Sequence, residues 1–127
     1  MSRRMSCSMT VDAVRARTKT VTRRRLDTWT TLRPGDRLTL IEKGMGLRKG
    51  ERQVVLAEVE IVDVRLECIL AIHDEGVAGV NAEGLRMSPN AFIEFWCRTH
   101  GVPLRNPRTP ALQDIVCRRI EWRYLDQ

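Results

Sequence analysis

The chain has 127 residues, which is the length of one domain and too short for two. Its hydrophobic fraction of 43% and charged fraction of 30% are those of a folded protein and argue against disorder. No apolar run approaches the ~20 residues of a transmembrane helix, and the basic N-terminus lacks the hydrophobic stretch of a secretory signal. We therefore expect a single domain over residues 1–127, cytoplasmic and without a membrane partner.

The net charge of +6 is concentrated at the N-terminal end of the chain. Residues 1–25 contain eight basic residues and one acidic residue, whereas the remainder contains 14 basic and 15 acidic ones. Because the arginine guanidinium group matches the geometry of phosphate oxygens, this segment favours a nucleic acid or nucleotide ligand. A solvated basic face that only keeps the protein soluble would give the same composition.

The cysteine and histidine content argues against a metal site. No two cysteines form a C-x-x-C pair, and the two histidines are far apart, so a zinc site would need scattered residues. We expect no metal and no cofactor, and we interpret the cysteines as small core residues in a reducing compartment. The four cysteines are Cys7, Cys68, Cys97 and Cys117.

Hydrophobic periodicity and turn residues divide the chain into short elements. The strongest strand signal is the alternation over residues 53–66, and its phase shift at Ile61–Val62 indicates a β-bulge. Ser88–Pro89 is a typical helix start. The expected elements are a strand over 5–9, a short helix ending near 17, strands over 18–24, 37–41 and 53–66, a short helix or turn over 68–74, loops over 76–84 and 103–110, a helix over 88–99 and a strand over 115–124. Strands outnumber helices without alternating with them, which favours an α+β fold with a curved sheet or barrel.

Three motifs follow one another in a recognisable order. The run Lys19-Thr20-Val21-Thr22-Arg23-Arg24 precedes a Pro34-Gly35-Asp36 turn, and Ala82-Glu83-Gly84 precedes a helix that ends with Trp96…His100-Gly101. In this order, and over nearly the whole chain, the sequence resembles the ASCH family of the PUA-like superfold. The resemblance implies a small PUA-like β-barrel flanked by two or three helices, with a cleft between the barrel and the helices.

The resemblance also implies a function in the cleft. Family members are thought to bind or act on RNA or modified nucleosides, and one bacterial branch looks like an amidohydrolase that deacetylates N(4)-acetylcytidine. The positions that match its catalytic set are Lys19, Thr22 and Glu83. Another branch is reported as a ribonuclease, which here would be metal-independent. The basic residues expected to hold phosphate groups are Arg17, Arg23, Arg24 and Arg25.

The proposed set has plausible chemistry and open alternatives. A threonine hydroxyl becomes a nucleophile when a base takes its proton, and a lysine serves as that base when burial or a nearby cation lowers its pKa. Glu83 would then orient the lysine or carry a proton to the leaving amine. Glu75 competes with Glu83, because it also precedes a glycine. Lys19 and Glu83 would equally suit a simple ion pair across the cleft.

Three classes of function remain open from the sequence. The first is a module that binds RNA, a nucleoside or a nucleotide without chemistry, with strong salt dependence from the basic segment. The second is the enzyme described above. The third is a protein-interaction adaptor that uses the basic loop at 43–50 and the segment 103–110. The sequence leaves the oligomeric state open, and of the possible states we favour a monomer.

Overall fold

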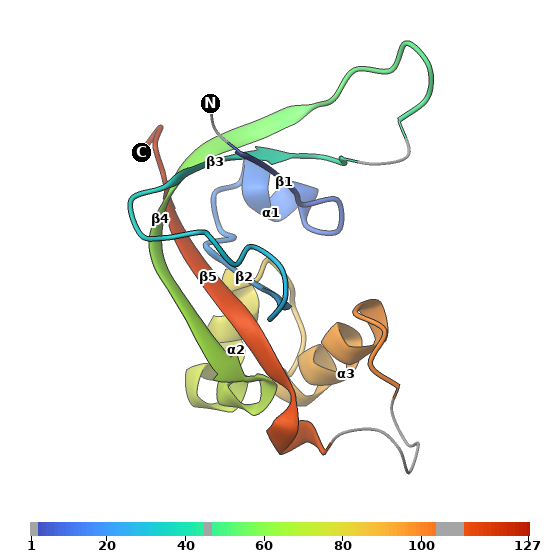
Figure 1. The fold of residues 1–127 in the computed structure, drawn as a ribbon, viewed down its shortest axis with the longest axis vertical. Helices are drawn as coiled ribbons and strands as arrows, with labels where there is room; N and C mark the ends of the chain where they lie inside the picture. Colours follow the sequence, from blue (N-terminus) through green and yellow to red (C-terminus); the bar gives the residue numbers. More distant parts are fainter. Residues whose placement is uncertain (1–2, 45–46, 104–110) are drawn as a thin grey trace.

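A curled five-stranded sheet forms the frame of the protein in a computed structural model, which describes residues 3–44, 47–103 and 111–127 (Figure 1). The order of strands across the sheet is β1-β3-β4-β5-β2. β1 pairs with β3 in parallel, and the other neighbouring strands are antiparallel. The strands are β1 (Arg3–Ser6), β2 (Val21–Arg25), β3 (Arg37–Ile41), β4 (Val55–Cys68) and β5 (Val116–Tyr124).

Three helices pack against this sheet. They are α1 (Val11–Arg15), α2 (Ile72–Ala82) and α3 (Pro89–Thr99), with short 3-10 turns at Ile69–Ala71 and Leu112–Asp114. α1 lies beside the upper part of the sheet, and α2 and α3 lie together at its lower end (Figure 1). The fold is therefore α+β, a half-barrel with flanking helices, which confirms the fold class expected from the sequence. No described helix is long and apolar enough to cross a membrane.

The long strand β4 bends where the sequence pattern changes phase. The register between β4 and β5 shifts between Ile61 and Asp63, which confirms the expected bulge. Ile61 is buried on one side of the shift, whereas Val62 is exposed. The bend lets one strand pair with β3 at one end and with β5 along the rest of its length.

The apolar core consists of two clusters with polar residues between them. One cluster joins the sheet to α1 and includes Trp122. The other lies under α2 and α3 and includes Trp96. Lys19 lies 5.9 Å from the centroid of the Trp122 ring, and the main-chain carbonyl of Arg23 accepts a hydrogen bond from the Trp96 indole. Lys19, just before β2, thus contacts the first cluster, and Arg23 on β2 contacts the second.

The structure corrects one element and shifts others. The expected loop over 76–84 is wrong, because α2 continues to Ala82. Gly76 does interrupt the helix, with φ 67° and ψ −151°, but Ile72 and Val80 on either side are buried in the second cluster and hold both parts in place. α1 ends at Arg15, and the second strand begins at Val21 instead of residue 18. Residues 104–110 of the expected loop lie outside the described residues.

Candidate functional site

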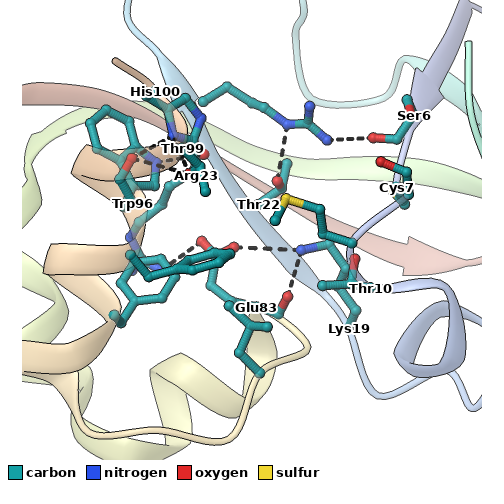
Figure 2. A pocket seen from close by; sticks show the side chains of 16 residues that line it. Ser6, Cys7, Thr10, Lys19, Thr22, Arg23, Glu83, Trp96, Thr99 and His100 are labelled. Carbon is teal, nitrogen blue, oxygen red and sulfur yellow. Dashed lines mark hydrogen bonds and ion pairs between the residues drawn. The ribbon is translucent and has the colours of Figure 1, made fainter. Parts of the chain in front are cut away.

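A pocket of about 210 Å³ opens between the two edge strands of the sheet, β1 and β2. The loop after β1 forms one wall, β2 forms the floor, and α3 with the end of α2 forms the opposite wall (Figure 2). The side chain of Arg24 crosses the gap between the strands, because its Nη2 donates to the Ser6 carbonyl at 2.8 Å. The polar residues that line the pocket include Lys19, Thr22, Arg23, Arg24, Glu83 and His100.

Main-chain contacts bring Lys19 to Glu83. The Trp122 indole donates to the Lys19 carbonyl at 3.0 Å, and the Tyr124 hydroxyl donates to the same oxygen. The Thr20 amide donates to the Ala82 carbonyl at 2.8 Å. These bonds tie the residues before β2 to β5 on one side and to the end of α2 on the other.

Lys19 is buried, and its amine points at both the main-chain carbonyl and the side-chain carboxylate of Glu83 (Figure 2). Its Nζ donates to the Glu83 carbonyl at 2.6 Å and lies 3.5 Å from Glu83 Oε2. Burial lowers the pKa of Lys19 from its usual 10.5, and this outweighs the opposing effect of the Glu83 carboxylate. A neutral lysine has two N–H donors and one lone pair. In that form both donors would serve the two Glu83 oxygens, and the lone pair would remain to accept a proton.

Arg23 holds the other side of the Glu83 carboxylate. Its Nη1 donates to Glu83 Oε1 at 3.1 Å, and its guanidinium side chain is fully buried. The same group also pairs with Glu67 and Glu75. Arg119 in turn binds Glu75, with Nη2 to Oε1 at 3.0 Å. Ion pairs between these arginines and glutamates therefore hold the Glu83 carboxylate on the side opposite Lys19.

Thr22 is positioned by Arg24. The Arg24 Nε donates to Thr22 Oγ1 at 3.1 Å, so the hydroxyl oxygen accepts from a cation and its own proton is free to be donated. A hydrogen bond from a cation favours the ionised form of an acid. The contact with Arg24 therefore makes the Thr22 hydroxyl easier to deprotonate.

The wall opposite Lys19 is aromatic. The rings of Trp96 and His100 are stacked, with centroids 4.1 Å apart and planes 16° apart. Phe92, Phe95 and Leu85 complete this side of the pocket. The pocket therefore has polar groups on β2 and at the end of α2, and a largely aromatic lining on α3.

The structure brings Lys19, Thr22 and Glu83 into one pocket and separates the arginines. Of the four arginines expected to bind phosphate, Arg24 lines the pocket with a half-buried side chain. Arg23 also lines it, but its guanidinium group is bound to three glutamates. Arg17 pairs with Asp126 at 2.6 Å, and Arg25 pairs with Asp27 at 3.2 Å, and neither residue lines this pocket.

Of the two rival glutamates, Glu83 lines the pocket and Glu75 lies behind it, bound to Arg23 and Arg119. Sequence reasoning missed that the loop at 7–10 forms a wall of the pocket and that His100 belongs to the opposite wall. The helix end Trp96…His100-Gly101 was a usable signal, because the sequence pattern placed it in the same motif set as Glu83. Within the ranges that the structure describes, no group of three or more His, Cys, Asp or Glu residues is arranged to hold a metal ion.

These features define a small α+β half-barrel with a polar pocket at the open edge of its sheet. No known family model and no curated protein matches the sequence. The fold is similar to the crystal structure of protein EF3133 from Enterococcus faecalis V583, family-model DUF984, with a TM-score of 0.65 and 14% identity. The similarity covers 98% of this chain and 80% of that chain. At this identity the likeness shows the fold alone.

Proposed function

We propose that the chain is an ASCH-type, PUA-like domain whose pocket binds a nucleoside, free or as a single base exposed from RNA. The observation that carries the proposal is the pairing of the polar set Lys19, Thr22, Arg24 and Glu83 with the aromatic wall of α3 in one pocket. A flat heterocycle suits such a site, because its faces pack on aromatic rings and its edges carry donors and acceptors. The four free cysteines fit a reducing compartment, so the proposal places the protein in the cytoplasm.

The distribution of charge favours a small ligand over a long polyanion. Arg17, Arg23 and Arg25 are matched by carboxylates of the chain itself. Within the described part of the chain, Arg24 donates to the neutral oxygens of Thr22 and Ser6, and it lines the pocket. The site therefore offers one cationic contact for a carbonyl or phosphate oxygen, not a track of several.

Calorimetric titration with cytidine, uridine, adenosine and N(4)-acetylcytidine tests this proposal. We expect saturable binding of at least one nucleoside, weakened by Thr22→Val, which removes a hydroxyl and keeps the shape of the side chain. Loss of one hydrogen bond should weaken binding about fivefold. Arg123→Met changes an exposed residue of β5 that pairs with Glu60 and does not line the pocket, and this variant should bind as the natural protein does. If none of the nucleosides binds, the proposal fails.

A second candidate is deacylation of an N-acylated cytidine, and the state of Lys19 and Thr22 favours it. An amine with a lowered pKa would suit removal of the Thr22 proton, and the Arg24 donor would support the resulting alkoxide. The Oγ1 atom would then attack the acetyl carbon, and the C–N bond would break as the leaving amine takes the proton back from Lys19. Water would hydrolyse the acetyl-threonine ester to free acetate and the hydroxyl.

Chromatographic detection of cytidine released from N(4)-acetylcytidine tests the second candidate. We expect Lys19→Met and Thr22→Val each to lower turnover by about a hundredfold or more. Arg123→Met again serves as the control. Binding of N(4)-acetylcytidine without release of cytidine at high protein concentration would exclude deacylation and leave the binding function.

A further inference from the structure

The neighbours of His100 fix which of its ring nitrogens carries a proton. The Nδ1 atom lies 2.8 Å from the Trp96 carbonyl oxygen and 3.1 Å from Thr99 Oγ1. A carbonyl oxygen can only accept a hydrogen bond, so Nδ1 must be the donor in this contact. In the neutral ring the second nitrogen, Nε2, then has a free lone pair and acts as an acceptor.

The surroundings keep the ring neutral and in place. Burial is the main cause that lowers the pKa of His100 below 6.5, and the nearby cations Arg24 and Arg25 on β2 act in the same direction. The Trp96 carbonyl and the Glu83 carboxylate oppose this shift without reversing it. The stack on Trp96 restricts rotation of the ring at the edge of the pocket (Figure 2).

Comparison with the other polar groups of the pocket shows why the His100 acceptor matters for ligand binding. Lys19 and Arg24 carry N–H donors, and Thr22 already accepts from Arg24 and has a proton to donate. The carboxylate of Glu83 is an acceptor, but Lys19 and Arg23 already bind it. Among the described lining residues with ionisable side chains, His100 thus offers an acceptor that no cation occupies.

We propose that His100 determines ligand specificity by accepting, at Nε2, a hydrogen bond from an N–H or O–H donor of the bound nucleoside. The inference rests on the proposed function. Two parts of a nucleoside could supply the donor: the exocyclic amine of an amino base such as cytosine, or a ribose hydroxyl. An amine at this position would select cytidine over uridine, because uracil has a carbonyl there and two acceptors would face each other.

Two amide substitutions separate the two nitrogens of the ring. His100→Asn places an amide near Nδ1, so it keeps a donor for the Trp96 carbonyl and removes the acceptor at Nε2. His100→Gln reaches further and places an amide oxygen near Nε2, so it restores an acceptor. Both variants lose the aromatic stack on Trp96, so a difference between them reports the acceptor at Nε2 and not the loss of the stack. His73→Asn is the control for the substitution itself, because His73 is exposed on α2 and does not line this pocket.

The experiment is calorimetric titration of the natural protein and the three variants with cytidine, uridine and 2′-deoxycytidine, with thermal unfolding as the check of folding. We expect His100→Asn to bind cytidine about fivefold more weakly than His100→Gln does, and His73→Asn to match the natural protein. Loss of the cytidine-over-uridine preference in His100→Asn would assign the donor to the base amine. Loss of the preference over 2′-deoxycytidine would assign it to the ribose.

Equal binding of cytidine by His100→Asn and His100→Gln, with the natural protein binding well, would overturn this inference and leave the proposed function intact. Absence of binding by the natural protein would overturn both. Failure of His100→Asn to fold would leave His100→Gln to be measured against pH. Protonation turns Nε2 into a donor, so the natural protein should lose affinity on acidification and His100→Gln should not. Parallel pH profiles would overturn the inference.

Discussion

A single buried amine links the stability of this protein to pH. Burial lowers the folded-state pKa of Lys19 below the 10.5 of an exposed lysine. Between these two values the unfolded chain binds more protons than the folded one, so the free energy of unfolding rises with pH in that range. We expect the stability of the natural protein, relative to Lys19→Met, to increase from the folded pKa up to pH 10.5 and to stay level above it.

Chemical denaturation across this pH range measures the difference. Other groups that titrate at high pH, such as Tyr124 and Cys117, are present in both proteins, so their contributions cancel in the comparison. Parallel stability profiles would mean that Lys19 keeps its proton in the folded protein. The amine would then have no lone pair, and the deacylation mechanism would lose its base.

The sequence pattern indicates the site residues but not the carboxylates with which the N-terminal arginines pair. Lys19, Thr22 and Glu83 were picked out together from a motif pattern, and the structure brings them into one pocket, whereas their roles stay predictions. The arginines looked alike in sequence, but Arg17 and Arg23 meet carboxylates that are distant along the chain. Long-range pairing of this kind has no local signal, because it depends on which strands become neighbours.

At the scale of elements, the turn after α2 is built around a glycine that cannot be replaced without moving its neighbours. Gly84 has φ 90°, a conformation that side chains disfavour, and an added Cβ would lie 2.9 Å from Ala13 Cβ and 3.1 Å from Thr10 Cβ. Gly35 has a similar φ of 92° but has no atom within 4 Å of such a Cβ. A substitution at Gly35 therefore tests backbone strain alone, whereas one at Gly84 tests backbone strain together with steric overlap.

We expect Gly35→Ala to destabilise the protein by about 1 kcal/mol through backbone strain alone. Gly84→Ala should cost about 1–3 kcal/mol more, because the first turn of α1 must shift to admit the methyl group. Urea unfolding of both variants gives the two values. Equal values for the two variants would show that α1 yields freely to the turn, so that the position of Glu83 would not depend on this contact.

The element that sequence reasoning missed shows how packing overrides local signals. Glycines at 76, 79 and 84 favoured a loop, because glycine destabilises helices. Gly79 is nevertheless buried within α2, where an added Cβ would lie 2.4 Å from Glu75 Cβ. The absence of a side chain permits the kinked helix to form, and the burial of Ile72 and Val80 stabilises it. This kinked helix presents Glu75 to Arg23 and ends at Ala82, directly before Glu83.

At the scale of the whole molecule, the curled sheet is an incomplete barrel, because its edge strands β1 and β2 do not pair with each other. Alternating apolar residues predicted the strands and the bulge that bends β4, but not which strands would form the edges. The order β1-β3-β4-β5-β2 depends on pairings between distant segments. The gap between β1 and β2 is bridged by the side chain of Arg24, and the pocket lies at this gap. The site therefore follows from the incomplete closure of the sheet.

The net charge of +6 suggests strong attraction to RNA, but the arrangement of the N-terminal arginines argues for a weak dependence on salt. Carboxylates of the chain lie beside several of these arginines, with Arg3 near Asp36 and Arg15 near Glu42 in addition to the pairs of Arg17, Arg23 and Arg25. Counterion release scales with the number of phosphate groups that a protein neutralises. Within the described part of residues 1–25, we expect the pocket contact of Arg24 to contribute most.

We therefore expect the logarithm of the binding constant for a short single-stranded RNA to fall with the logarithm of salt concentration with a slope of about −0.7, the value for one phosphate contact. Fluorescence anisotropy at a series of potassium chloride concentrations measures this slope. Arg24→Gln should bring it close to zero, and cytidine, which has no phosphate, should bind independently of salt. A slope several times steeper in the natural protein would mean that the surface arginines leave their carboxylates for the RNA backbone, and the ligand would then be a polymer held along β1 and β2.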